Sequence, residues 1–332
     1  MTHPTEMQAI VCSKPQDDLV TTGLAEVAVP TPGPDEILVK VGAASLNPVD
    51  WKLCAGIAPW WDKPMIVGLD AAGTVAATGA DVRVIKQGDR VMWHGNLNRD
   101  GVFADYAVTP ARVVSRIPDT VDFSAAAALP CAGLTAYQAL VRKMRLQPGE
   151  TLIVQGASGG VGGFALQIAR NIGVHTIALA RPDHWDHAKS LGADHCVDYR
   201  SEDLKEKVAS LTDGLGADAM LEVVNSGDAR TSLDLLRYNG QLATIDPLPD
   251  LTNVPPYTYA ASLHEVALGG AYGAGDLRTQ ADFAAMGDQL LSWLAEGKLD
   301  PMISRRIKMA HVPEALKDLR NRSFVGKAVI EM

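Results

Sequence analysis

The chain has 332 residues, of which 47% are hydrophobic and 21% charged, the balance of a globular protein about two domains long. Its formal net charge is −9, and no block of lysine and arginine offsets it, so nucleic acid is not expected as a partner. No apolar run reaches the ~18 residues that a membrane span needs, and the start lacks the basic and apolar regions of a signal peptide. The four cysteines are far apart, as free thiols in a reducing compartment are. We therefore expect a cytoplasmic protein that does not bind membranes.

Short apolar runs broken by glycine and proline fill the first 120 residues. β-Rich segments at 37–41, 68–75 and 89–93 are separated by turn sequences, which is typical of a compact, barrel-like β domain. Two helices are predicted next, at 124–129 with Ser124 as its N-cap, and at 134–144.

Strands and helices then alternate, which indicates a parallel sheet with both faces covered. The predicted strands are 151–155, 174–179, 195–198, 218–224, 241–245 and 265–270, and the helices are 161–171, 184–191, 201–211 and 229–237. A long amphipathic helix is predicted at 277–296. The remaining elements, strands 303–308 and 325–331 with a short helix after Pro313, are expected to return to the β domain.

A glycine-rich loop joins the strand 151–155 to the helix that follows it. Five of the eight residues from 156 to 163 are glycine, and the strand–loop–helix context distinguishes a dinucleotide site from a chance match. Glycine lets the backbone approach a pyrophosphate, and the helix N-terminus offers it free N–H groups. Ala157 replaces the first glycine of the usual fingerprint, and the alternative is a loop that serves tight packing alone.

The end of the next strand bears on the choice of cofactor. A site for NAD usually places an acidic residue there, whereas this chain places Arg181, followed by Asp183 and His184. A guanidinium at this position can pair with a 2′-phosphate, and His184 and Tyr199 could add donors. The sequence therefore favours NADPH, with Asp183 on an NAD ribose as the alternative.

Six motifs follow one another along the chain: ASLNPVDWK at 44–52, GLDAAG at 68–73, LPCAGLTAY at 129–137, ASGGVG at 157–162, LGAD at 191–194 and GKAV at 326–329. This set resembles the medium-chain dehydrogenase/reductase superfamily, and more narrowly its zinc-independent quinone oxidoreductase branch. The resemblance runs nearly from end to end.

The resemblance implies an α/β protein of two domains. A GroES-like β-barrel catalytic domain would comprise 1–124 and 272–332, and a Rossmann domain with a doubly wound parallel sheet would comprise 125–271. Nicotinamide would meet substrate in a cleft between them. We expect the cofactor to contact Asn47, Thr135, Gly156, Ala157, Ser158, Gly159, Gly160, Val161, Arg181, His184, Tyr199, Asn225 and Ser226.

No metal is expected. Zinc-dependent relatives take ligands at positions where this chain has Asn47, Leu69 and Cys131, and one thiol cannot hold a catalytic zinc that normally needs three protein ligands. Cys131 is then expected to be a small buried residue near the cleft. A zinc site built from Cys54, His94 and Asp70 is the alternative.

Without zinc, the chain is expected to reduce a quinone or an α,β-unsaturated carbonyl compound, because negative charge then develops on an oxygen that side chains can protonate. The resemblance implies that Asn47 orients nicotinamide and substrate. Lys52 is the expected donor to the oxygen if partial burial lowers its pKa, and His94 is its rival. The alternatives are a zinc-type alcohol dehydrogenase and a non-catalytic NADPH-binding or sensor protein.

Two further expectations concern partners. The expected catalytic domain contains Trp51, Trp60, Trp61 and Trp93, and at least one of these four is expected to line a pocket for a small planar apolar substrate. The strand 265–270 is expected at the edge of the Rossmann sheet, where two chains could pair into a homodimer, as in relatives.

Overall fold

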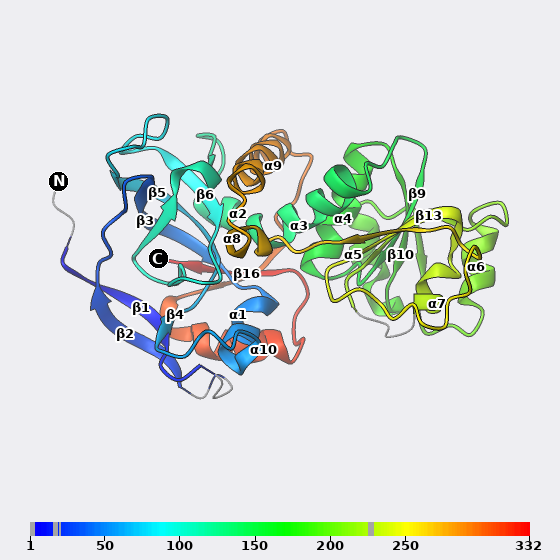
Figure 1. The fold of residues 1–332 in the computed structure, drawn as a ribbon, viewed down its shortest axis with the longest axis horizontal. Coiled ribbons are helices and arrows are strands. Elements are labelled where there is room, and N and C mark those ends of the chain that lie inside the picture. The colour runs from blue at the N-terminus through cyan, green and yellow to red at the C-terminus, as the bar shows by residue number, and fades with distance from the viewer. Residues whose placement is uncertain (1–3, 16–18, 20, 225–228) are drawn as a thin grey trace. The chain divides into compact units, whose positions relative to one another are not determined.

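The computed structural model describes residues 4–15, 19, 21–224 and 229–332. The chain divides into two compact units (Figure 1). The first unit comprises Met1–Leu134, Gly269–Gly297 and Pro301–Met332, and the second comprises Thr135–Leu268 and Lys298–Asp300. In the part of the chain that the structure describes, no helix is long and apolar enough to cross a membrane.

The first unit is built on two sheets. The smaller has the strand order β2-β1-β4, and the larger has the order β15-β16-β3-β5-β6-β8, with β7 paired to β3. The long central strand β3 is buried along most of its length, because β5, β7 and β16 all pair with it. The strand bounds are β1 Glu6–Cys12, β2 Thr22–Ala28, β3 Glu36–Ser45, β4 Met65–Ile66, β5 Asp70–Thr78, β6 Arg90–His94, β7 Tyr106–Pro110, β8 Ser115–Arg116, β15 Ile303–Ile307 and β16 Lys327–Glu331. The prediction that the last strands return to the β domain is confirmed.

Helices complete the first unit. Their bounds are α1 Pro48–Lys52, α2 Phe123–Ala127, α8 Gly270–Gly273, α9 Leu277–Ala295 and α10 Val312–Arg320, and π-helical segments cover Leu53–Ile57 and Pro130–Leu134. The predicted N-cap of α2 is wrong: Asp122 caps the helix, because its side chain accepts a hydrogen bond from Ala125 N at 2.7 Å, and Ser124 lies inside it. This helix packs on β3, β5 and β6, so 125–134 belong to the first unit.

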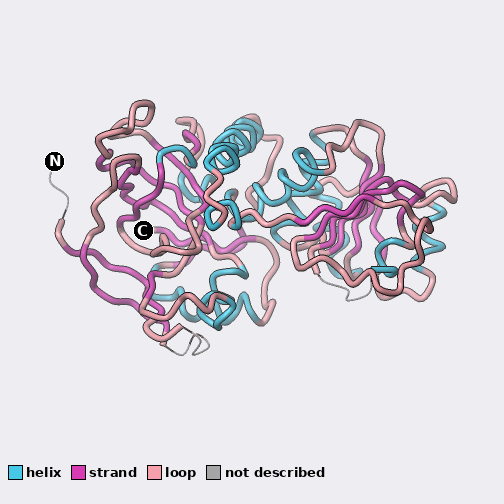
Figure 2. The backbone as a smooth tube through the Cα atoms, viewed as in Figure 1, coloured by secondary structure: helices cyan, strands magenta, loops and turns pink. Residues whose placement is uncertain are grey.

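The second unit holds a six-stranded parallel sheet with the order β11-β10-β9-β12-β13-β14. Numbered within this sheet, the order is 3-2-1-4-5-6, that of a Rossmann fold. The strands are β9 Thr151–Gln155, β10 His175–Leu179, β11 His195–Val197, β12 Ala217–Glu222, β13 Leu236–Thr244 and β14 Ser262–Glu265. The helices are α3 Thr135–Tyr137, α4 Gly160–Asn171, α5 Trp185–Ser190, α6 Leu204–Ser210 and α7 Ala229–Leu233, and a π-helical segment covers Gln138–Lys143. Figure 2 shows these helices and strands along the backbone.

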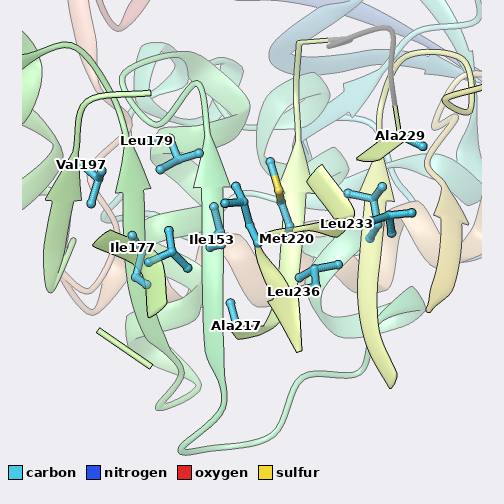
Figure 3. Packing of buried hydrophobic residues seen from close by; sticks show 12 residues of the cluster. Ile153, Ile177, Leu179, Val197, Ala217, Met220, Ala229, Leu233 and Leu236 are labelled. Atoms are coloured by element: carbon cyan, nitrogen blue, oxygen red, sulfur yellow. The ribbon is translucent and has the colours of Figure 1, made fainter. Parts of the chain in front are cut away.

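Buried aliphatic side chains hold this sheet to its helices. Ile153, Ile177 and Met220 come from three neighbouring strands and pack with Leu233 of α7 (Figure 3). All four are at most 2% exposed, and each such side chain contributes roughly 1.5–3 kcal/mol when it leaves water. The core therefore fixes the strands whose C-terminal ends carry the glycine loop and Arg181.

The last strand of the sheet lies elsewhere than predicted. β14 covers 262–265 instead of 265–270, and the helix α8 begins at Gly270. The ladder ends where its partner does, since Glu265 pairs with Thr244, the last residue of β13. β14 is the edge strand of this sheet, as predicted for the last strand.

Candidate functional site

The glycine loop lies between β9 and α4, and it contains the six predicted residues Gly156 to Val161. Gly159 is exposed and is the N-cap of α4, so the unpaired N–H groups of the first helical turn follow it directly. The neighbouring strands β9 and β12 run side by side, and the strand order reverses between them. Ligands of such sheets bind outside the carboxyl ends of the strands at this switch point.

Two glycines of the loop are required for different reasons. A Cβ on Gly162 would lie 2.4 Å from Gly156 O, so the close approach of helix and loop needs this glycine. A Cβ on Gly159 would meet only Gly156 O at 3.4 Å, an ordinary contact, and its φ of −87° suits any residue. Packing within the chain therefore explains Gly162 but not Gly159, and close approach of a ligand to the exposed loop would explain Gly159.

The structure brings Arg181 and His184 together at the end of β10. Arg181 Nη2 lies 2.8 Å from His184 Nε2 and 3.2 Å from Asp183 Oδ2. Tyr199 follows β11, whose Val197 pairs with Leu179 of β10, so it stands at the same sheet edge, half exposed. The two residues proposed for alternative cofactors, Arg181 and Asp183, are thus in contact, and the carboxylate would compete with a phosphate for the guanidinium. Asn225 and Ser226 lie outside the described residues.

In the first unit, a buried polar cluster surrounds Asn47. The cluster contains Asn47, Asp50, Asp70, His94, Cys131 and Lys327, which come from five different elements and the loop before α1. All except Cys131 are at most 3% exposed. Buried polar groups are costly unless they are hydrogen-bonded, and here most of them bond to one another, whereas Asp50 Oδ1 has no partner.

The amide of Asn47 is held at both ends. Lys327 Nζ donates to Asn47 Oδ1 at 2.6 Å and to Leu46 O at 3.2 Å. The amide nitrogen donates to Asp70 Oδ2 at 2.8 Å and to Ser45 O at 3.3 Å. The role predicted for Asn47 toward nicotinamide and substrate stays a prediction, because these partners already use both of its N–H groups.

Asp70 is the centre of the cluster. Its Oδ1 lies 3.0 Å from His94 Nδ1 and accepts from Cys131 N at 3.0 Å, and its Oδ2 accepts from Cys131 N at 2.9 Å and from Asn47. The β5–β6 ladder produces this arrangement, since Asp70 and His94 are directly paired across the two strands. The pairing of Asp70 with His94 was considered from the sequence only as part of a zinc site, and Lys327 was not identified as a site residue.

The cluster can be tested as a zinc site. Asp70, His94 and Cys131 offer ligand atoms that all lie within 4.8 Å of one another. The Asp70 carboxylate, however, already contacts three groups of the chain: the amide of Asn47, the backbone N–H of Cys131 and Nδ1 of His94. The residues therefore do not fit zinc unless the bonds that hold Asn47 and His94 are given up.

The other residues considered as zinc ligands have different surroundings. Leu69 is 1% exposed and has no ligand atom, and Cys54, offered by the alternative zinc set, is buried beside Cys12. Cys131 lies next to Asp70 and is partly exposed, whereas a small buried residue was expected at this position.

The remaining predicted residues are dispersed. Lys52 is half buried at the end of α1, and Thr135 is 7% exposed at the start of α3 in the second unit. Among the four tryptophans, Trp61 and Trp93 are at most 2% exposed and serve the core. Trp60 is 55% exposed, and Trp51 lies under the guanidinium of Arg320 at 5.4 Å.

Comparison with known proteins decides the family. Residues 33–119 match the alcohol dehydrogenase GroES-like domain, and residues 160–292 match the zinc-binding dehydrogenase family. A quinone oxidoreductase of Pseudomonas aeruginosa is 31% identical over 306 residues, which cover 90% of this chain and 92% of that protein. The chain belongs to the medium-chain dehydrogenase/reductase superfamily, in its quinone oxidoreductase-like branch.

Solved structures agree with membership of this superfamily. An alcohol dehydrogenase superfamily protein from Novosphingobium aromaticivorans is 28% identical with a TM-score of 0.89, covering 98% of this chain and 99% of that one. The quinone oxidoreductase from Coxiella burnetii is 26% identical with a TM-score of 0.85, covering 98% and 99%. Superfamily membership implies a nicotinamide cofactor and an oxidoreductase activity of the quinone oxidoreductase type.

Asp50 gives the cluster a pH dependence. Removal from water raises the pKa of this carboxyl well above its usual value, and the bond from Asn47 N at 2.6 Å opposes the rise only in part. Its contribution to stability is therefore fully present below the pKa of the unfolded chain and is lost as pH rises toward the folded pKa. As pH rises through this range, the stability of Asp50→Asn should increase relative to that of the wild type by up to about 1.4 kcal/mol per pH unit. Chemical denaturation at acidic and neutral pH measures this, and a difference that does not change with pH would contradict it.

Proposed function

We propose that this protein is an NADPH-dependent reductase that transfers hydride to a quinone or an α,β-unsaturated carbonyl compound without zinc. The observation that carries the proposal is the cluster around Asp70. Two of the three expected zinc ligands are replaced by Asn47 and Leu69, and the carboxylate that could substitute for them is already bonded to chain donors. Reduction of a conjugated carbonyl needs a proton donor rather than a Lewis acid.

Each part of the chain has a role in this scheme. NADPH supplies the hydride when bound. The glycine loop and the first turn of α4 would hold its pyrophosphate, and the pair Arg181–His184 would hold a 2′-phosphate through charge-assisted hydrogen bonds. In the first unit, Asn47 supplies a fixed polar centre, and Lys52 or His94 donates a proton to the oxygen that becomes negative.

The deciding experiment measures NADPH oxidation by metal-stripped protein with quinones, enals and enones as acceptors. We expect turnover without added metal. Turnover of alcohols that appears only after zinc is restored would support a zinc-type alcohol dehydrogenase instead. Tight NADPH binding without turnover of any acceptor would support the non-catalytic sensor.

The cofactor choice is tested at the end of β10. Arg181→Ala should raise the Kd for NADPH by roughly ten- to a hundredfold, because a hydrogen bond to a charged group contributes about 1.5–3 kcal/mol. The same variant should leave NADH binding nearly unchanged, since NADH has no 2′-phosphate. Asp183→Asn is the matched control: removal of the competing carboxylate at 3.2 Å should strengthen NADPH binding. Fluorescence titration with both cofactors measures these effects, and an equal loss for NADPH and NADH in Arg181→Ala would contradict the assignment.

The protein is further proposed to be a homodimer that pairs through the edge strand β14 of the parallel sheet. Light scattering should give a mass near twice the 35.3 kDa of one chain. A proline at Leu263 in β14 should reduce the mass to that of a monomer, because proline cannot donate to a strand ladder. A monomeric wild type, or a dimer that survives Leu263→Pro, would contradict this mode of assembly.

A further inference from the structure

The hydrogen bonds of the buried cluster form a chain in which each partner fixes the next. At one end stands Lys327, whose ammonium group has three donors and no acceptor. It can bond to Asn47 only through the amide oxygen, at 2.6 Å. This contact decides between the two orientations of an amide that distance alone does not separate. The amide nitrogen of Asn47 must therefore face Asp70, at 2.8 Å.

The hydrogen bonds of Asp70 also determine which nitrogen of His94 carries the proton. The carboxylate accepts from Asn47 Nδ2 and from the backbone N–H of Cys131, two groups that can only donate. An ionised carboxylate has no proton to give, so its contact with His94 Nδ1 at 3.0 Å requires the imidazole to donate. The neutral ring then carries its proton on Nδ1, and Nε2 is the nitrogen that can take up and release a second one.

Contacts from two elements hold the backbone of His94 in place. The backbone of His94 is held by Tyr272 of α8, whose hydroxyl donates to His94 O at 2.6 Å, and by the ladder to β5. The charged and titratable groups facing the cluster are Asp70 of β5, Asp50 of α1, Cys131 of the segment Pro130–Leu134 and Lys327 of β16. Asp70 contacts His94 Nδ1 at 3.0 Å, as the aspartate of a catalytic triad contacts its histidine, and such a contact holds the ring in one orientation.

We propose that His94 is the proton donor of the reduction and that Asp70 is a positioning residue which fixes the proton on His94 Nδ1 and clamps Asn47. This assignment rests on the proposed function, and it takes His94 rather than Lys52 as the proton donor. The structure connects His94 to Asn47 through a single carboxylate, whereas Lys52 lies at the far end of α1.

Hydride from C4 of NADPH forms a bond to the β-carbon of the enone, the C=C electrons shift toward the carbonyl, and the oxygen takes the proton from His94 Nε2. NADPH is oxidised to NADP⁺, the substrate becomes an enol that rearranges to the saturated carbonyl compound, and neutral His94 keeps its Nδ1 proton on Asp70. Water then reprotonates Nε2.

Two substitutions at one position separate chemistry from structure. His94→Asn places an amide N–H near the position of Nδ1, so it can keep the bond to Asp70 while lacking Nε2. His94→Gln places its amide near Nε2 and gives up the bond to Asp70. If the proposal holds, His94→Asn folds and binds NADPH like the wild type, yet loses roughly 10²–10⁴-fold in kcat/KM, the usual contribution of a general acid.

The pH profile and the tautomer give independent readouts. Wild-type kcat/KM should fall at alkaline pH with the loss of one proton, and this limb should be absent from both His94 variants. In ¹⁵N spectra of histidine-labelled protein, the signals lost in His94→Gln should show, at alkaline pH, a protonated Nδ1 and an unprotonated Nε2. In Asp70→Asn this tautomer preference should disappear.

Three results would overturn the proposal. The first is His94→Asn with wild-type kcat/KM, the second is an alkaline limb that disappears in Lys52→Gln instead, and the third is a ring protonated on Nε2. If the wild type reduces no acceptor, the proposed function fails, but the NMR spectra still decide whether Asp70 fixes the His94 tautomer. If His94→Asn does not fold, the wild-type spectra and the pH profiles of the wild type and Lys52→Gln decide whether His94 is the proton donor.

Discussion

Gly159→Val should weaken NADPH binding by about 100-fold, equivalent to about 2.7 kcal/mol, while stability falls by no more than about 1 kcal/mol, the usual cost of a poorer N-cap residue. The reason is that the side chain would project from an exposed loop residue with an extended backbone, and its Cβ would meet only Gly156 O at an ordinary 3.4 Å. The space it fills is the space that a pyrophosphate at the start of α4 would need. Isothermal titration with NADPH and a thermal melt of the apoprotein measure the two effects.

Gly162→Val is the matched comparison, because the same substitution three residues later meets the protein itself. A Cβ there would lie 2.4 Å from Gly156 O and 2.8 Å from Ala157 Cα, both backbone atoms that cannot turn away. We expect it to destabilise the second unit by roughly 3 kcal/mol through overpacking. Wild-type affinity in Gly159→Val would show that the loop does not hold the cofactor, and equal melting of the two variants would show that the loop has no such division of roles.

The sequence predicts the first part of the second unit well, because β9, β10, β11 and β12 are short and each is followed by a helix. The strand 151–155 is found at its predicted bounds, and α4 begins one residue before its prediction, because a buried parallel strand followed by a glycine turn is a local pattern. The last strand is placed wrongly for a physical reason. β14 ends where β13 ends, and Val266 and Leu268, which suggested a strand, are buried in irregular backbone instead.

The polar cluster of the first unit could be predicted only in part. The sequence indicates Asn47, His94 and Cys131 only as single residues. The contact between Asp70 and His94 depends on the register of β5 with β6, which the sequence does not reveal. Lys327 lies near the C-terminal end of the sequence, 280 positions after Asn47, so no local pattern connects the two residues. The one local signal is a lysine inside an apolar final strand, GKAV, since a lysine is almost never fully buried without a partner.

Lys327→Met should destabilise the first unit by roughly 3–5 kcal/mol, the usual cost of removing one partner from a buried charged set. Methionine keeps much of the volume of the stem, but it gives Asn47 Oδ1 and Leu46 O no donor, and it removes the positive charge that faces the buried carboxyls. Lys86→Met is the control, because Lys86 is exposed in the same unit and its replacement should change stability by about 0.5 kcal/mol or less. Denaturant titration followed by tryptophan fluorescence is a suitable measurement, since five of the six tryptophans belong to this unit.

A second substitution shows whether charge or hydrogen bonding is responsible. Lys327 lowers the pKa of Asp50 while burial raises it, so without the ammonium Asp50 is still less able to ionise. Adding Asp50→Asn to Lys327→Met should then recover about 1 kcal/mol at neutral pH, and the two changes should not be additive. Strict additivity would mean that Lys327 acts on Asn47 and Leu46 O alone. A Lys327→Met protein as stable as Lys86→Met would mean that the ammonium does not hold the cluster, and the orientation of Asn47 derived from it would then have no support.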